Sequence, residues 1–134
     1  MRIRLFLISI LLFPWSCEIP VDPVPGGRLQ YKAFDSTGTL LVQGWMTLDT
    51  ADSSRVTGEW HFEKVGDPQD IGPQVGEGRL EGAWYNSVLS VNLNPNFADN
   101  NVYLTGKLEK NRFSGRWMWT GFPGRLNEGD FIAS

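Results

Sequence analysis

The chain has 134 residues, of which 41% are hydrophobic and 20% charged, and its formal net charge is −3. This length and composition suit a single globular domain, so no second domain is needed. The 12 Lys and Arg residues are outnumbered by 15 acidic ones, which excludes the basic surface typical of nucleic-acid binding and a polybasic membrane patch.

The first 16 residues have the pattern of a secretory signal peptide. Arg2 and Arg4 form its positive end, residues 5–13 form a short apolar core, and Cys17 follows directly. That apolar run is too short to span a bilayer. Removal of residues 1–16 would leave 10 basic against 15 acidic residues. We therefore expect export of an acidic mature protein.

Cys17 is the only cysteine, so an intrachain disulfide is impossible. Its position directly after a signal-type segment resembles the lipidation site of bacterial lipoproteins, although Pro14 and Trp15 depart from the usual motif and only Ser16 fits. The resemblance implies a lipid anchor on Cys17 and a location in the bacterial cell envelope, on the periplasmic side or on the outer-membrane surface. The alternatives are cleavage that leaves a free thiol and an uncleaved anchor.

Residues 17–27 combine the lipidation site with a predicted tether. The segment contains three prolines and a closing pair of glycines, so it cannot hold a helix or a paired central strand. We expect it to hold a single domain, residues 28–134, away from the membrane.

The domain shows no helical period of useful length. Alternating apolar and polar runs recur about every ten to fifteen residues with turn residues between them, which is typical of an all-β meander. We predict strands at 28–35, 39–48, 55–64, 77–85, 88–94, 101–109, 112–120 and 128–133. Short connections without a covering helix favour an eight-stranded antiparallel up-and-down barrel, because closure removes unpaired edges. A two-sheet β-sandwich is the alternative.

The alternation assigns each residue to one of two faces. The apolar face collects Val56, Gly58, Trp60, Phe62, Leu80, Gly82, Trp84, Leu89, Val91, Leu93, Val102, Leu104, Gly106, Leu108, Phe113, Gly115, Trp117, Trp119, Phe131 and Ala133. The other face is polar and charged, with Thr57, Glu59, His61, Glu63, Arg79, Glu81, Lys107, Glu109, Ser114 and Arg116. A polar exterior is the reverse of an outer-membrane barrel, so we expect the domain to sit in water.

The pattern Gly-x-Trp occurs three times, at residues 58–60, 82–84 and 115–117. In a strand, residues two apart share a face. We predict that Gly82 and Gly115 face inward, where the missing side chain makes room for an indole on a neighbouring strand and lets the wall curve.

Three segments together resemble calycin barrels, and locally the avidin family. They are GAWYN at 82–86, VLSV at 88–91 and LTGKLE at 104–109. The resemblance implies that Asn86 and Ser90 are polar contacts for the ureido ring of biotin. Leu108 stands where that family has a ligand-binding tyrosine, and the segment lies in the middle of the chain.

An eight-stranded barrel can be filled by side chains or can hold one small ligand. If a cavity remains, its candidate lining is Trp60, Trp84, Asn86, Leu104, Trp117 and Trp119. This lining would suit a small hydrophobic molecule. The alternative is that the tryptophans fill the core.

No catalytic, metal or cofactor site is predicted. The sole histidine, His61, alternates outward between Glu59 and Glu63, which is typical of a solvated strand face. Nucleophilic catalysis needs a positioned base, and the chain offers no second histidine. We therefore expect a protein that is not an enzyme.

The last predicted connection, residues 121–127, contains Phe122, Pro123 and Arg125. Phe and Arg are favoured anchors at protein interfaces, so this loop is a candidate contact for an envelope protein. The alternative is that Phe122 folds back and plugs the barrel end. Two functions stay open: a non-catalytic carrier of a small hydrophobic ligand, and an interaction or inhibitor module that presents its loops to a partner.

Overall fold

The structure is a computed structural model that describes residues 27–134. The predicted signal peptide, the proposed lipidation site at Cys17 and the tether up to residue 26 lie outside the described residues. Within residues 27–134, there is no helix long and apolar enough to cross a membrane.

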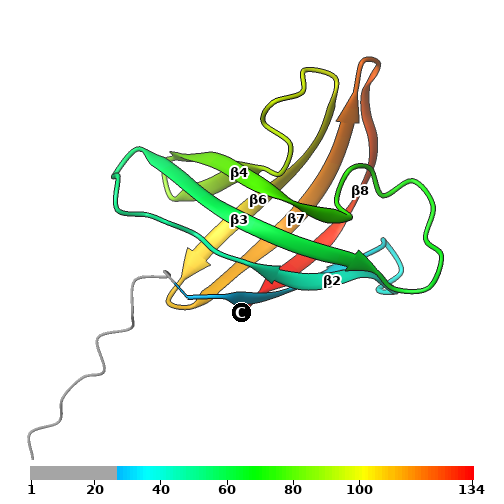
Figure 1. Cartoon of the computed structure of the whole chain (residues 1–134), viewed down its shortest axis with the longest axis horizontal. Coiled ribbons are helices and arrows are strands. Elements are labelled where there is room, and N and C mark those ends of the chain that lie inside the picture. Colours follow the sequence, from blue (N-terminus) through cyan, green and yellow to red (C-terminus); the bar gives the residue numbers. More distant parts are fainter. Residues whose placement is uncertain (1–26) are drawn as a thin grey trace, which may run out of the picture.

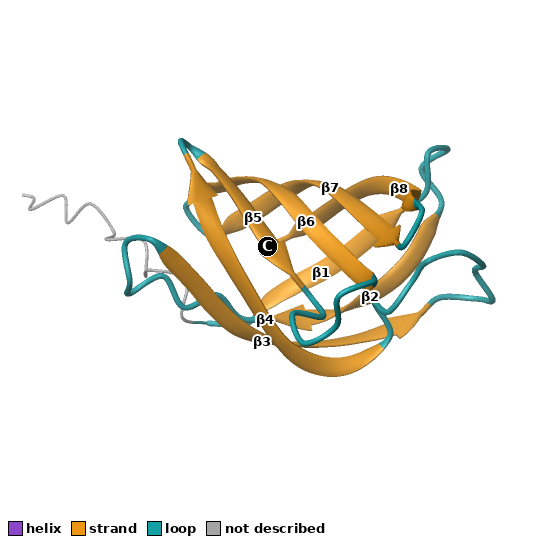
Figure 2. Cartoon of the chain, turned by 90° about the horizontal axis from the view of Figure 1, so that it is seen from above, coloured by secondary structure: helices purple, strands orange, loops and turns teal. Residues whose placement is uncertain are grey.

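The chain forms eight antiparallel strands in up-and-down order (Figure 1). They are β1 (Leu29–Phe34), β2 (Leu40–Met46), β3 (Arg55–Lys64), β4 (Gly76–Tyr85), β5 (Val88–Asn92), β6 (Asn100–Glu109), β7 (Arg112–Gly121) and β8 (Gly124–Ala133). Each strand pairs with the next, and β1 pairs with β8, so the sheet is a closed barrel. Figure 2 shows the strands crossing around a common interior. The predicted all-β barrel is confirmed, and the alternative sandwich is wrong.

The strand boundaries differ most at β8, which begins at Gly124 and not at residue 128. Only Phe122 and Pro123 connect β7 to β8, so most of the predicted connection 121–127 is strand. The ladder shifts register between Trp119 and Thr120. Such an irregularity breaks the period-2 alternation, and this concealed the start of β8 in the sequence.

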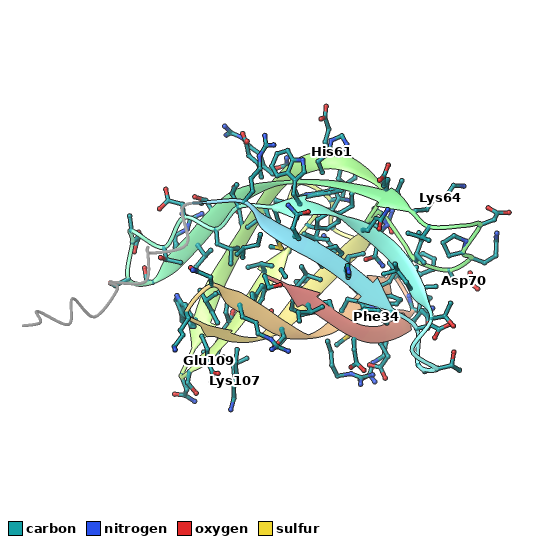
Figure 3. All side chains as sticks on the ribbon, turned by 90° about the horizontal axis from the view of Figure 1, so that it is seen from below. Phe34, His61, Lys64, Asp70, Lys107 and Glu109 are labelled. Atoms are coloured by element: carbon teal, nitrogen blue, oxygen red, sulfur yellow. The ribbon has the colours of Figure 1, made fainter. Side chains whose placement is uncertain are left out.

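The inward and outward faces follow the prediction. The buried hydrophobic side chains on the strands and connections include Leu29, Tyr31, Val42, Met46, Leu48, Val56, Trp60, Phe62, Leu80, Leu89, Val91, Leu93, Val102, Leu104, Phe113, Trp117 and Phe131. Trp84, Leu108 and Trp119 are partly buried against this core. The charged residues of β3 and β4 lie on the outer wall, as Figure 3 shows for His61.

The glycine prediction needs a correction about what each glycine faces. A Cβ at Gly115 would lie 2.1 Å from the Thr105 carbonyl oxygen, and one at Gly82 would lie 2.5 Å from Val91 Cγ1. These glycines therefore allow close approach of the neighbouring strand, and not of an indole. The indoles lie at other glycines, because Trp60 pairs with Gly78 and Trp117 pairs with Gly129.

In an up-and-down barrel, successive connections alternate between the two ends. We call the end that holds Gly27 and the connections 47–54, 86–87 and 110–111 the proximal end. The distal end holds the connections 35–39, 65–75, 93–99 and 122–123. Figure 3 shows the two ends apart, with Lys107 and Glu109 near one and Phe34, Lys64 and Asp70 at the other.

The connection 65–75 closes part of the distal end. Ile71 and Gln74 are buried, and Gln74 Oε1 accepts a hydrogen bond from the Tyr31 hydroxyl at 3.2 Å. Gln74 Nε2 also donates to the Ile71 carbonyl oxygen at 2.8 Å. Phe122, in contrast, is 89% exposed. The expectation that Phe122 folds back as a plug is therefore wrong, and Ile71 and Gln74 lie at this end of the core.

Candidate functional site

The interior residues predicted to line a ligand pocket are packed into the core. Trp117 and Leu104 are fully buried, and Trp60 is 5% exposed. Trp60 Nε1 donates to the Leu93 carbonyl oxygen at 2.9 Å, and Trp117 Nε1 donates to the Phe34 carbonyl oxygen at 2.8 Å. These hydrogen bonds fix both rings against the wall.

An aromatic cluster fills the middle of the interior. Tyr31 stacks on Phe62 with ring centroids 3.9 Å apart, and Phe131 packs against both Tyr31 and Phe113. Burial raises the pKa of the Tyr31 phenol above its ordinary value, so the phenol stays protonated and donates to Gln74. The buried phenol of this cluster therefore has its hydrogen-bond partner, and no ionised group lies at the centre of the cluster.

The two residues implied by the avidin resemblance do not face this core. Asn86 is exposed in the two-residue β4–β5 turn, with a positive φ of 59°. Ser90 alternates with the buried Leu89 and Val91, and its hydroxyl lies 3.0 Å from Thr105 Oγ1 on the outer wall. Trp84 and Trp119 lie at the margin of the core, where Trp119 Nε1 donates to Asn100 Oδ1 at 2.8 Å.

The outer wall carries one row of stacked polar and aromatic groups. His61 lies parallel to Trp45, with ring centroids 6.0 Å apart, and its Nδ1 is 3.5 Å from Glu77 Oε2. The Arg28 guanidinium sits 4.0 Å from the centroid of the Trp45 ring. No group of three or more metal-ligating side chains occurs among residues 27–134.

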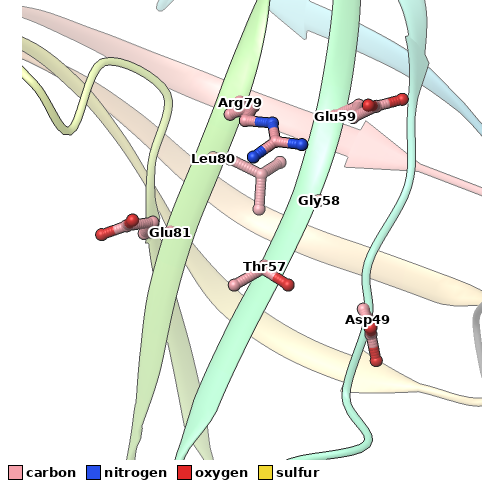
Figure 4. Close-up of a pocket in the computed structure, with 7 residues that line it drawn as sticks. All are labelled: Asp49, Thr57, Gly58, Glu59, Arg79, Leu80 and Glu81. Carbon is pink, nitrogen blue, oxygen red and sulfur yellow. The ribbon is translucent and has the colours of Figure 1, made fainter.

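Shallow hollows lie on the same wall. Figure 4 draws one of about 310 Å³, bounded by β3, β4 and the connection that carries Asp49. Glu59, Arg79 and Glu81 at its rim are exposed side chains, and Arg55 of β3 pairs with Glu81 at 3.8 Å. Mixed exposed charges of this kind are typical of a solvated strand face.

The distal end carries most of the large exposed apolar side chains. Phe122 is 89% exposed, Phe97 is 62% exposed, and Val75 and Leu126 lie at the same end with 43% and 44% exposed. Tyr85 is the exception, because it lies at the proximal end. Arg125, predicted to act beside Phe122, has its guanidinium 3.2 Å from Glu128 Oε2 within the same strand.

The distal connections are held by hydrogen bonds to the barrel. Asn101 is only 3% exposed, and its Nδ2 donates to the carbonyl oxygens of Asn94 at 2.7 Å and Phe97 at 2.9 Å. Asn127 Nδ2 donates to the Asp70 carbonyl oxygen at 2.9 Å. Phe97 therefore projects from a backbone held by hydrogen bonds, which lowers the entropy that binding would cost.

The distal connections are also acidic. They contain Asp35, Asp67, Asp70 and Asp99 and no Lys or Arg. The Asp35 carboxylate accepts hydrogen bonds from Thr37 and Thr39, and the Thr37 hydroxyl contributes most to a pKa below the ordinary value. Lys64, at the end of β3, is 3.4 Å from Asp67.

No protein-family model, curated protein or solved structure matches the chain. The structure therefore defines the class by itself: a small closed up-and-down β-barrel, compatible with a calycin-like fold.

The sequence indicated Phe122 as a candidate contact but not Phe97. It also did not indicate that the connections 65–75 and 93–99 are held by hydrogen bonds to the barrel. Phe97 stands in a Pro-Asn-Phe turn sequence, where an exposed aromatic has no periodic partner to mark it. Ile71, the one large aliphatic residue between two Gly-Pro-rich stretches, was the available signal for a connection that folds onto the core.

Proposed function

We propose that the protein is a lipid-anchored, non-catalytic module of the bacterial cell envelope that presents its distal end to a protein partner. The observation that carries the proposal is the combination of a filled interior with two exposed aromatic side chains at the distal end. Phe97 lies on a connection held by Asn101, and Phe122 lies in the two-residue turn between β7 and β8. Isolated exposed aromatics are ordinary on a surface, but large apolar side chains gathered at one end favour recognition.

The geometry of the chain supports this orientation. Gly27, the first described residue, precedes β1 at the proximal end. A lipid on Cys17 would therefore attach the domain from the proximal side, and the distal connections would point away from the membrane. Loops on a rigid scaffold are a common place for binding residues.

The anchor is tested by metabolic labelling with palmitate. We expect label in the parent chain and none in Cys17→Ser. Equal labelling of both chains would contradict the anchor, while leaving the distal surface to be tested by itself.

The distal surface is tested by photo-crosslinking in cells. A benzoylphenylalanine placed at Phe122 should form an adduct with another envelope protein. The same residue at Tyr85, which is 67% exposed at the opposite end, is the matched control. Absence of an adduct at Phe122, or an equal yield at Tyr85, would contradict the proposal.

Carriage of a small hydrophobic ligand stays a prediction from the sequence. The buried side chains of the interior, Trp117, Leu104 and Phe62 among them, would have to move to admit one. Such a movement is costly in a well-packed core, so the geometry supports the interaction module better.

A further inference from the structure

The charge of the distal end specifies the chemistry of its partner. Three of the four aspartates of the distal connections share a connection with an exposed apolar side chain, namely Asp67 and Asp70 with Val75, and Asp99 with Phe97. The distal connections contain no Lys or Arg. Asp67, Asp70 and Asp99 are exposed, and Phe97 precedes Asp99 by two residues.

The nearest cations do not reverse this charge. Lys64 lies 3.4 Å from Asp67, and Arg125 lies 3.2 Å from Glu128, so each has an acidic neighbour within the protein. Within the described part of the chain, Asp70 and Asp99 have no ion pair. An incoming surface would meet carboxylates together with aromatic rings.

We propose that the distal end docks on a cationic protein surface, with Phe122 inserted into an apolar pocket of that partner. The proposal rests on the proposed function and adds the chemistry of the partner. Complementary charge accelerates and orients association, and a nearly fully exposed aromatic supplies the apolar anchor. An anionic lipid surface is disfavoured by the same carboxylates.

The mixed recognition can be tested with defined peptides on the full chain. The probe is a fluorescent peptide rich in lysine and leucine. Its two counterparts carry glutamate in place of lysine, or serine in place of leucine. We expect saturable binding of the first peptide only, weakening as salt is raised. Equal binding of the glutamate peptide, or no binding of the lysine–leucine peptide, would overturn the proposal.

Variants assign the binding to the distal end. Phe122→Ser should weaken binding by about tenfold or more, as expected for an interface anchor. The combined change Asp67→Asn, Asp70→Asn and Asp99→Asn should weaken it by about tenfold. Matched controls at the proximal end are Tyr85→Ser and the pair Asp49→Asn with Asp52→Asn, which should leave binding unchanged.

Each further outcome decides one claim. Unchanged melting temperatures of the variants would show that a loss of binding is not a loss of folding. Equal weakening by the proximal controls would overturn the assignment to the distal end. Attachment of the distal end to vesicles of phosphatidylglycerol would overturn the cationic partner. A crosslinked adduct at Phe122 in cells without any peptide binding would refute the cationic partner and leave the proposed function intact.

Discussion

Trp60 and Trp117 brace the barrel wall in the same way at two separate places. Trp60 of β3 lies against Gly78 of β4 and donates to the Leu93 carbonyl oxygen. Trp117 of β7 lies against Gly129 of β8 and donates to the Phe34 carbonyl oxygen. In both, an inward indole passes a glycine on the adjacent strand and reaches a carbonyl beyond that strand.

We call these two arrangements, in which an indole passes a glycine and donates to a carbonyl oxygen, the indole bridges. The two indole bridges differ in the space around the glycine. A Cβ at Gly78 would lie 3.1 Å from Trp60 Nε1, with only indole atoms among its three nearest neighbours. A Cβ at Gly129 would lie 2.0 Å from the Phe34 carbonyl oxygen and 2.6 Å from Trp117 Nε1. The difference has a topological cause, because β8 meets β1 next to Gly129, whereas β4 pairs with β5 only from Glu81 onward.

A glycine in this barrel is therefore required to the degree that the backbone of another strand lies behind it. A side chain can shift by a few tenths of an ångström, but a paired strand cannot shift without loss of its ladder hydrogen bonds. The variants below test that rule.

The largest effect is expected for Gly129→Ala. The new methyl group would collide with the β1 backbone at the seam that closes the barrel, so we expect a loss of about 3 kcal/mol in unfolding free energy. Urea denaturation followed by tryptophan fluorescence measures it. A midpoint equal to that of the parent would contradict the tight seam.

Gly115→Val should cost nearly as much, about 2–3 kcal/mol. A Cβ at Gly115 would lie 2.6 Å from Gly106 Cα as well as 2.1 Å from the Thr105 carbonyl oxygen, so β6 would have to move away. Strand propensity alone predicts a gain, since Val suits a strand better than Gly.

Ser114→Val is the control for Gly115→Val. Ser114 is adjacent in β7 and lies on the outer wall, so this change should be neutral or slightly stabilising. Thermal melts compare the two variants. A Gly115→Val melting temperature at or above that of the parent would refute the inward assignment.

Removal of the indole N–H should weaken the two bridges alike. Trp60→Phe and Trp117→Phe each remove the indole donor to a carbonyl oxygen, that of Leu93 and that of Phe34 respectively. We expect each to cost about 1–3 kcal/mol by denaturant unfolding. Trp45→Phe is the matched control, because Trp45 lies on the outer wall against His61 and Arg28. A loss as large in Trp45→Phe would show that the bridging hydrogen bonds add nothing.

These bridges also show how far the sequence could predict the barrel. The alternation of apolar and polar residues correctly placed Trp60 and Trp117 inside, because a strand has a strict period of two. It could not identify Gly78 and Gly129 as their partners. Partnership depends on the register between strands. Alternation fixes the face of each residue, but a shift by two residues keeps every face and changes every partner.

The distal end was predictable only in part, for a related reason. Phe122 and Pro123 stand out in a turn sequence, so the sequence indicates them as a candidate contact, and this contact stays a prediction. The roles of Gln74 and Asn101 depend on where the connections fold relative to Tyr31 and Phe97, and polar residues in a connection carry no periodic signal of burial.

The smallest effect is expected for Gly78→Ala, below about 1 kcal/mol. The added methyl group would meet only the Trp60 indole, at 3.1–3.2 Å, and the ring can yield slightly while its hydrogen bond to Leu93 is kept. An alanine at position 78 would add no backbone strain, since the φ of Gly78 lies outside the left-handed region. The decisive quantity is the difference between Gly129→Ala and Gly78→Ala in the same urea experiment, expected at about 2 kcal/mol. Equal losses would mean that the indole resists displacement as strongly as the β1 backbone does. The rule that backbone behind a glycine sets the stability cost of substituting that glycine would then be wrong.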